Sequence, residues 1–146
     1  MSAIYLDHNA TTPVAPEVLD AMLRFWGAEF GNPSAAHALG RRAHDALEGA
    51  RADVAALIGA RPDEIVFTGG GTEADNLAIA GAHAAAPGPV VCPATEHHAV
   101  LHACAALHGH TVPVDARGVV DLDALDAALD DTTSVVSVML ANNEVG

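Results

Sequence analysis

The amino-acid sequence predicts an α/β fold in which helices alternate with strands that pair in parallel. Short apolar segments alternate along the chain with helical patterns long enough to serve as crossover connections, and such connections join parallel strands. A glycine loop separates one apolar segment, residues 65–67, from the helical pattern that follows it. Residues 134–140 form a nearly continuous apolar run, which is typical of a strand buried on both faces.

The first half of the chain is expected to begin with an extended arm and to continue with two helices. Residues 4–6 form a short predicted strand, and a polar turn follows it. Pro16 starts the first helix, in which apolar residues recur at helical spacing as far as Trp26. Ser34 is the expected N-cap of a longer second helix, and Gly59 is the expected residue after its last turn.

The second half of the chain is expected to supply the sheet. Segments rich in β-branched residues are separated by helical patterns and by turns that contain glycine or proline. The expected order is a strand at residues 64–68, the glycine loop, a helix from residue 72 to about residue 86, a strand at 90–92, a helix capped by Thr95, a strand at 111–114, a helix at 121–129 and a strand at 134–140.

Composition excludes several classes of function. The chain has 146 residues, of which 51% are hydrophobic, and a formal net charge of −13. This excess of negative charge disfavours nucleic acid and anionic membrane as partners. No apolar run approaches the roughly 18 residues of a membrane span, and two cysteines are too few for a disulfide framework. We therefore expect a cytoplasmic protein that binds neither nucleic acid nor membrane.

The glycine loop is the first candidate site. Three consecutive glycines, Gly69 to Gly71, allow positive φ angles and close approach of backbone N–H groups to a ligand. A helix that opens at Thr72 adds free N–H donors and the positive end of its dipole, which together favour a phosphate. The loop is neither a P-loop, since no lysine follows it, nor a GxGxxG fingerprint. A plain turn capped by Thr72, with Asp75 as its partner, remains an equally good interpretation.

Other polar residues follow the predicted strands. His97 comes just after one strand, where an imidazole could stack on a flat ring or move protons. His98 and His102 have the spacing of a helical zinc pair, but the sequence contains neither HExxH nor CxxC, so we expect no metal site. Asn142 and Asn143 follow the last strand, where amides can bind a ligand hydroxyl or form an ordinary polar loop. Both cysteines are interpreted as core residues.

Five separated motifs, taken together, resemble the cysteine desulfurases, which are pyridoxal-phosphate enzymes of the class V aminotransferase family. The resemblance extends from one end of the chain to the other. The motifs are Tyr5-Leu6-Asp7-His8-Asn9-Ala10-Thr11-Thr12-Pro13, Gly31-Asn32-Pro33-Ser34 with His37, residues 64–68 with 70–73 and 75–76, Thr95-Glu96-His97 with residues 99–101, and Asn142-Asn143-Glu144-Val145-Gly146.

This resemblance implies a fold and an activity. The implied fold is that of a fold-type I enzyme, with a large domain built on a mixed, mostly parallel sheet that has helices on both faces. Residues 1–15 would be an N-terminal arm that belongs to the small domain, and residues 16–146 the first part of the large domain. The implied activity converts L-cysteine to L-alanine and passes the sulfur to an enzyme cysteine as a persulfide, for iron–sulfur cluster or thio-cofactor assembly. The family forms homodimers, and its sulfur goes on to an acceptor protein.

The resemblance also implies roles for individual residues. Gly71 and Thr72 would bind the phosphate of pyridoxal 5'-phosphate. His97 would stack on the cofactor ring and act in catalysis by assisting proton transfer, and Asn143 would hydrogen-bond the ring hydroxyl. Residues Asn9, Ala10 and Thr11 would lie near the substrate. A selenocysteine lyase or another class V aminotransferase would have the same motifs.

The family's Schiff-base lysine and its persulfide-forming cysteine would fall beyond residue 146, and the chain contains no lysine at all. Pyridoxal chemistry needs such an amine. We therefore expect an incomplete part of a longer enzyme that is inactive alone. The alternative from another class is a non-catalytic half-domain that binds a phosphate ligand.

Overall fold

The computed structural model describes residues 4–144 and 146. Two compact units make up the chain, Met1–Phe67 and Thr68–Gly146, and each is described by itself. The structure confirms the predicted α/β class, with helices and a parallel sheet. The expected division of the full-length protein at residue 15, between an arm and a large domain, stays a prediction.

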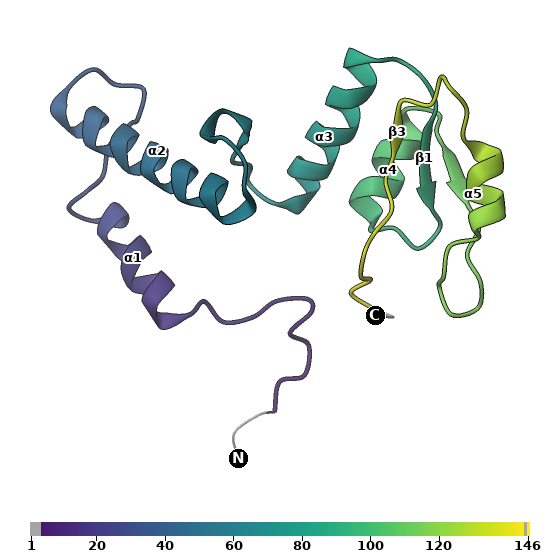
Figure 1. Ribbon diagram of the computed structural model, residues 1–146. Coiled ribbons are helices and arrows are strands. Elements are labelled where there is room, and N and C mark those ends of the chain that lie inside the picture. The colour runs from purple at the N-terminus through teal and green to yellow at the C-terminus, as the bar shows by residue number, and fades with distance from the viewer. Residues whose placement is uncertain (1–3, 145) are drawn as a thin grey trace. The chain divides into compact units, whose positions relative to one another are not determined.

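The first unit contains two α-helices and a short 3₁₀ turn. Helix α1, Pro16–Trp26, begins with a proline in its first turn, as predicted. Helix α2, Ala38–Ile58, ends at Gly59, whose φ of 71° lies in the left-handed region that glycine adopts without a steric penalty. The 3₁₀ turn η1 is Pro62–Glu64. These elements are labelled in Figure 1, except for η1.

The predicted start of α2 was wrong. His37, and not Ser34, is the N-cap, and its side chain accepts a hydrogen bond from the backbone N–H of Gly40. The backbone N–H of Ser34 instead donates to the side chain of Asn32 at 2.9 Å. A tight turn closed by the hydrogen bond from Ala35 N to Asn32 O therefore precedes the helix.

The strands predicted at residues 4–6 and 64–68 do not form. Ile65 has an extended backbone, with φ −97° and ψ 126°, but a strand also needs a partner for its backbone groups. The carbonyl oxygen of Ile65 accepts a hydrogen bond from Nη1 of Arg51 at 2.6 Å instead. The same guanidinium lies 4.9 Å from the centre of the Phe67 ring. Contacts with α2 thus replace the expected ladder.

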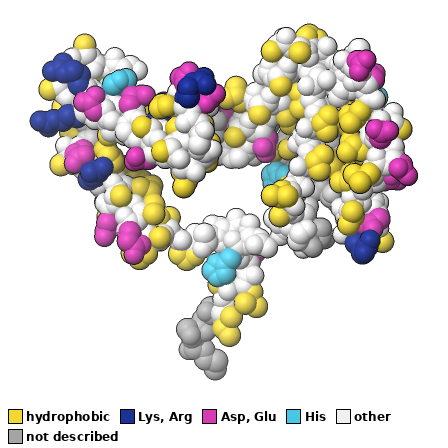
Figure 2. Space-filling model, in the orientation of Figure 1, with side chains coloured by type: hydrophobic (Ala, Val, Ile, Leu, Met, Phe, Trp, Pro, Cys, Tyr) yellow, Lys and Arg dark blue, Asp and Glu magenta, His cyan; other side chains and the backbone are white. Residues whose placement is uncertain are grey.

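Most apolar side chains of the first unit are exposed within that unit. Of its described residues only Gly40 and Ala55 are buried. In α1 the side chains repeat at helical spacing, yet Val18 is 50% exposed and Trp26 is 71% exposed. Figure 2 shows apolar side chains over α1 among charged ones. The apolar stripe of α1 therefore finds no core within Met1–Phe67.

The second unit is a parallel sheet with helices packed against it. In chain order it contains α3 (Gly71–Ala85), β1 (Val90–Pro93), α4 (His98–Ala106), β2 (His110–Val112), α5 (Leu122–Ala128) and β3 (Val135–Val136). The strand order is β2-β1-β3, and both pairs are parallel, with Val91 opposite His110 on one side and Val136 on the other. Helix α3 packs on α4, α4 packs on β1 and β2, and α5 packs on β2 (Figure 1).

The core of this unit lies between the central strand and α4. Val90 and Cys92 of β1 are fully buried, and they pack with Val100 and Cys104 of α4 and with Ile79 of α3. Before β1, the backbone at Gly88 lies so close to Thr132 that only glycine fits, because a Cβ at Gly88 would collide with the carbonyl oxygen of Thr132. Because β1 and β3 are parallel, the loop after β1 and the chain after β3 both leave the sheet at the carboxyl ends of its strands.

The last predicted strand is shorter and less buried than expected. Only Val135–Val136 pairs as β3, although the N–H of Ser137 still donates to Val91 O at 3.0 Å. Val136 and Val138 are 45% and 47% exposed. The prediction of burial on both faces was therefore wrong for the described chain. The reason is that β3 lies at the edge of the sheet, where only β1 pairs with it.

Candidate functional site

The glycine loop ends directly at the first turn of α3. Gly70 is the N-cap, with φ 163° and ψ 176°, and the helix begins at Gly71. Thr72 is therefore inside the first turn, and the predicted capping role of Thr72 was wrong. None of the three glycines adopts the left-handed conformation that the sequence led us to expect. Their value in this structure is the absence of side chains, and not unusual φ angles.

The loop presents several unpaired donors. In the described part of the chain, the backbone N–H groups of Gly70, Gly71, Thr72 and Glu73 have no acceptor, as expected for the first turn of a helix. The N–H of Gly69 differs from these, because it donates to Oε2 of Glu73 at 2.6 Å. Four amides at the positive end of a 15-residue helix are therefore available to an anion.

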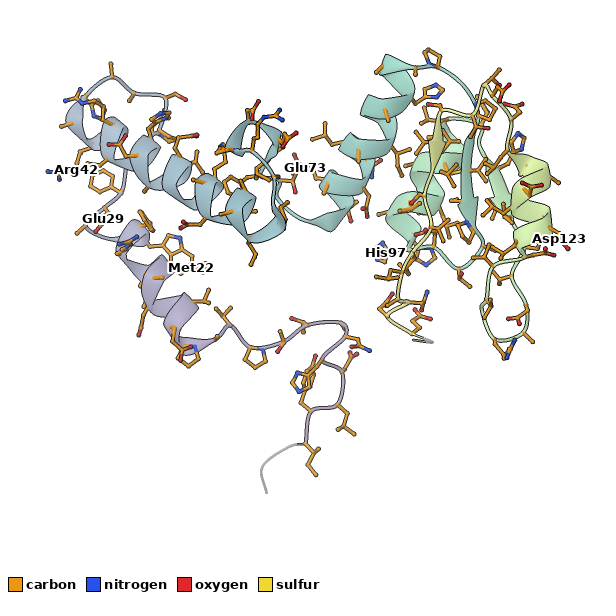
Figure 3. All side chains as sticks on the ribbon, in the orientation of Figure 1. Met22, Glu29, Arg42, Glu73, His97 and Asp123 are labelled. Atoms are coloured by element: carbon orange, nitrogen blue, oxygen red, sulfur yellow. The ribbon has the colours of Figure 1, made fainter. Side chains whose placement is uncertain are left out.

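These donors border an open hollow. Apart from its chain neighbours and the adjacent helix backbone, a Cβ added at Gly70 or Gly71 would meet no atom within 4 Å, so a ligand can approach the backbone there. Figure 3 shows Glu73 at the start of α3. The residues that line the hollow are Gly69, Gly70, Gly71, Thr72, Glu73 and Asn76. The amides, the Thr72 hydroxyl and the free space together fit a phosphate group.

A second hollow of the same unit lies at the start of α4, where Figure 3 labels His97. His97 is the N-cap of this helix, with φ −60° and ψ 146°, and Nδ1 of its ring accepts a hydrogen bond from the N–H of Ala99 at 3.1 Å. Thr95, which the sequence favoured as the cap, precedes the helix by three residues. The lining residues are Ala94, Thr95, Glu96, His97, His98, Leu101, Asn142, Asn143 and Glu144.

The chain after β3 is tied to this second hollow. The side-chain amide of Asn142 donates to Thr95 O at 2.8 Å, and the backbone N–H of Glu144 donates to Asn142 Oδ1 at 2.8 Å. These two hydrogen bonds of Asn142 explain why Asn143 and His97, which are far apart in the sequence, line one hollow. Because β1 and β3 pair in parallel, the two segments follow their strands at the same end of the sheet.

The other site residues that the sequence suggested lie elsewhere. Gly71 and Thr72 line the glycine-loop hollow, and not the hollow of His97. Asn9, Ala10 and Thr11 belong to the first unit, where the N–H groups of Ala10 and Thr11 donate to Asp7 O. Tyr5 closes this turn, because its hydroxyl donates to Thr11 O at 3.2 Å.

Sequence reasoning missed two carboxylates at these sites. Glu73 binds the glycine loop itself, and its position in the first turn of α3 is a known capping position, which gave a usable signal. Glu96 lines the second hollow and is only 7% exposed. Its Oε1 atom is buried and has no hydrogen-bond partner among the described residues. Nothing in the sequence distinguished it from an exposed residue before a helix.

The two cysteines are buried core residues, as the sequence predicted. Burial, assisted by the neighbouring Cys104 and by the charge of Glu96, raises the pKa of the Cys92 thiol to about 12. A thiol with such a pKa is almost entirely protonated at neutral pH. Cys92 is therefore a poor nucleophile in this structure.

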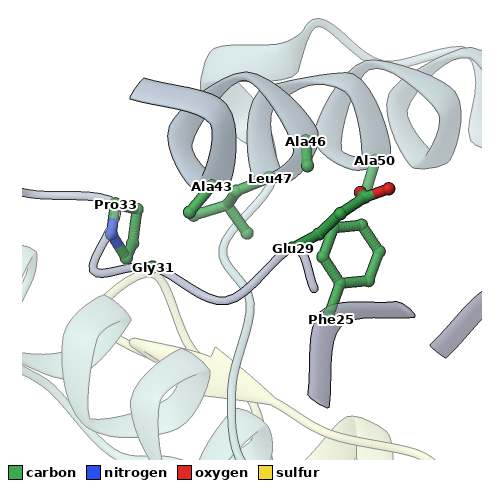
Figure 4. Close-up of a pocket in the computed structure, with 8 residues that line it drawn as sticks. All are labelled: Phe25, Glu29, Gly31, Pro33, Ala43, Ala46, Leu47 and Ala50. Atoms are coloured by element: carbon green, nitrogen blue, oxygen red, sulfur yellow. The ribbon is translucent and has the colours of Figure 1, made fainter. Parts of the chain in front are cut away.

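A third hollow, in the first unit, is mainly apolar. It measures about 350 Å³ and lies between α1, the loop after it and α2 (Figure 4). Its lining residues are Phe25, Glu29, Gly31, Pro33, Ala43, Ala46, Leu47 and Ala50. It offers no group for acid or base chemistry other than Glu29.

The described residues contain neither a metal-binding cluster nor a membrane-spanning helix. Among them, no cluster of three or more histidine, cysteine, aspartate or glutamate side chains is arranged to hold a metal ion. Within the same residues, no helix has both the length and the apolar character needed to cross a membrane.

Comparison with known proteins identifies the family. The family model for aminotransferase class V matches residues 4–146. The chain belongs to the class V aminotransferase family. Its relatives within this family include a cysteine desulfurase of Cereibacter sphaeroides, which is 50% identical over 155 aligned positions that cover 100% of this chain and 40% of the relative. A putative cysteine desulfurase IscS 1 of Bacillus subtilis is 46% identical and is covered to 41%.

Solved structures of NifS-like proteins also match the chain. A NifS-like protein matches with a TM-score of 0.89 and 39% identity, over 98% of this chain and 42% of that protein. A NifS-like protein from Rickettsia africae matches with a TM-score of 0.83 and 33% identity. The chain therefore spans about two fifths of the length of the relatives it matches. The resemblance to the cysteine desulfurases inferred from the motifs is confirmed.

Proposed function

We propose that this chain is part of a pyridoxal 5'-phosphate-dependent cysteine desulfurase. The observation that carries the proposal is the position of His97 and Asn143 in one hollow, within a class V aminotransferase that is 50% identical to a protein named cysteine desulfurase. The substrate would be L-cysteine and the products L-alanine and a cysteine persulfide. The complete enzyme would be a cytoplasmic homodimer that passes sulfur to an acceptor protein for iron–sulfur cluster assembly.

The glycine-loop hollow would hold the cofactor phosphate. The free N–H groups of Gly71 and Thr72 and the Thr72 hydroxyl provide hydrogen-bond donors to a dianion, and the α3 dipole favours the same charge. The absence of side chains at Gly70 and Gly71 leaves the required space. These N–H and hydroxyl donors thus fit the cofactor phosphate, and they need no metal ion to bind it.

The second hollow would hold the ring. His97 would stack on it and Asn143 would hydrogen-bond its hydroxyl. When bound, pyridoxal phosphate supplies an electron sink for negative charge that develops on the substrate. His97 would exclude water from one face and hold a proton close to the reacting atoms. Asn9, Ala10 and Thr11 would lie near the substrate. The chain has no lysine, so the amine that bonds the cofactor would come from outside these 146 residues.

The experiment uses the full-length protein that contains this chain. We expect it to purify with pyridoxal phosphate and to form equal amounts of alanine and transferred sulfur from L-cysteine. L-selenocysteine is the matched substrate for comparison, because a strong preference for it would identify a selenocysteine lyase. Retention of the cofactor without release of alanine from either substrate would refute the desulfurase proposal.

A further inference from the structure

The ring of His97 has two nitrogens, and the structure uses one of them for the helix. Nδ1 accepts the hydrogen bond from the backbone N–H of Ala99 at 3.1 Å. The carbonyl oxygen of His97 accepts the next bonds of the helix, from Val100 and Leu101, at 2.9 and 3.1 Å. His97 is therefore both a lining residue of the hollow and the N-cap of α4.

This hydrogen bond decides which nitrogen carries the proton. A backbone amide nitrogen always carries its hydrogen, so Nδ1 of His97 has to present a lone pair toward Ala99. In the neutral ring the proton then lies on Nε2. A proton on Nδ1 would face the N–H of Ala99 and would remove the cap of α4.

We propose that His97 takes part in the reaction as a neutral ring with its proton fixed on Nε2, while Nδ1 is reserved for capping α4. This inference rests on the proposed function and deepens it, because it states which hydrogen bond the capped ring can offer. The capped ring donates through Nε2–H, and Nε2 can take up a proton only when Nδ1 gives up the cap and carries a proton instead. His97 lines the hollow together with Asn143 and Leu101, and in this tautomer the ring's remaining donor is Nε2–H. Nδ1 is excluded as the base for as long as α4 keeps its first turn.

His37 provides an internal comparison. It is the N-cap of α2, and its Nδ1 accepts the N–H of Gly40 at 3.2 Å. The same argument therefore assigns its ring proton to Nε2. By contrast, His98 and His102 lie inside α4, where their rings stack at a centroid distance of 5.8 Å. Among the described residues, no hydrogen bond to the His98 or His102 ring fixes its tautomer.

The first test is nitrogen-15 NMR of the full-length protein with labelled histidine. We expect the His97 ring without cofactor to show an unprotonated Nδ1 and a protonated Nε2 at neutral pH, and His37 to show the same pattern. Loss of one pair of signals in His97→Asn assigns them. Finding the proton on Nδ1 of His97, or on both nitrogens, would overturn the inference.

The second test separates capping from ring chemistry. Asparagine is a good N-cap without an imidazole, whereas alanine lacks both. We expect amide hydrogen exchange in the first turn of α4 to be about tenfold faster in His97→Ala than in the wild type. His97→Asn should retain most of the protection, and both variants should lose alanine formation. Equal loss of protection in the two variants would refute the capping role.

Both measurements are made without cofactor or cysteine. A protein with the expected tautomer and no desulfurase activity would therefore refute the proposed function alone. A protein with full desulfurase activity and a proton on Nδ1 would refute this inference alone.

Discussion

The carboxylate of Glu73 accepts a hydrogen bond from the backbone N–H of Gly69 at 2.6 Å, and so ties the glycine loop to the first turn of α3. The bond occupies one amide of the loop and leaves the next four available. It also puts a negative charge on the border of a hollow that fits an anion. Restraint of the loop favours phosphate binding, whereas the charge opposes it.

Substitution of Glu73 separates these two effects. We expect Glu73→Ala to lower the affinity for pyridoxal phosphate about fivefold to tenfold, because the loop loses one hydrogen bond of about 1 kcal/mol. Glu73→Gln keeps an acceptor and removes the charge, so its affinity should equal or exceed that of the wild type. Fluorescence titration of the full-length apoprotein measures both, with Asp75→Asn as the control on the same helix. Tighter binding by Glu73→Ala would mean that the charge dominates.

Thr72 gives a direct test of the phosphate hollow. Thr72→Val keeps the shape of the side chain and removes the hydroxyl, and a hydrogen bond to a charged group contributes roughly 1.5–3 kcal/mol. We expect cofactor affinity to fall by about one to two orders of magnitude, while alanine formation at saturating cofactor stays nearly normal. Thr72→Ser is the matched control that restores the hydroxyl. Unchanged affinity in Thr72→Val would remove this residue from the site.

Gly71 should tolerate a side chain. Its backbone is helical, and a methyl group there would meet no atom within 4 Å apart from its chain neighbours and the backbone of its own helix. We expect Gly71→Ala to raise the free energy of unfolding by about 0.4–1 kcal/mol, because alanine loses less backbone entropy on folding. The comparison is made on the apoprotein, because a methyl group at Gly71 would take up space next to the proposed phosphate. Gly88→Ala is the contrasting variant, which should destabilise the protein because its Cβ would collide with Thr132 O. Urea unfolding measures both.

His108 is the one described non-glycine residue with a left-handed backbone, at φ 55°. It follows the last turn of α4, where glycine is usual. Replacement by glycine should stabilise the protein by roughly 0.5–1 kcal/mol. The same replacement at His102, inside α4, should destabilise it by a similar amount. If thermal unfolding gave the two variants the same shift, strain at His108 would not contribute to stability.

The raised pKa of Cys92 should make the stability of the folded protein sensitive to alkaline pH. Its thiol has a pKa of about 12 in the folded protein, mainly because of burial, against an ordinary value of 9.0. Since the folded pKa is raised, the stability from the neutral thiol is fully present below about pH 9 and is lost as the pH rises toward 12. We expect Cys92→Ala to lose less stability over this interval. Alkylation of wild-type Cys92 at pH 8 should require unfolding; rapid labelling of the folded protein would contradict the assigned burial.

The sequence predicted helices better than strands, and particular residues explain why. Pro16, Gly59 and Asp121 act on the backbone within one turn, so α1, the end of α2 and the start of α5 followed from local signals. The segment at residues 64–68 has the composition of a strand, but a strand requires a partner that the local sequence does not reveal. Arg51 takes the Ile65 carbonyl instead, which no pattern indicated.

The part of the candidate site that belongs to the sequence motifs, including His97 and Asn143, was predictable from the sequence. Parallel pairing of β1 with β3 explains how His97 and Asn143 meet, and the alternation of elements predicted that pairing. The capping role of His97 was not predictable, because histidine is a weaker N-cap candidate than Thr95 by composition alone. The role of Glu96 depends on burial by residues distant in the sequence.

The central position of β1 has a consequence for synthesis of the chain. Val91 lies between His110 and Val136, which are translated later by 19 and 45 residues. After β1 leaves the ribosome, both of its hydrogen-bonding edges stay unpaired until β2 and β3 are made. The time until β3 is made is more than twice the time until β2 is made. At typical elongation rates of about 5–20 residues per second, the most buried strand spends roughly two to nine seconds with an open edge. Timing of translation therefore determines how long a strand made of Val90, Val91 and Cys92 is exposed to aggregation.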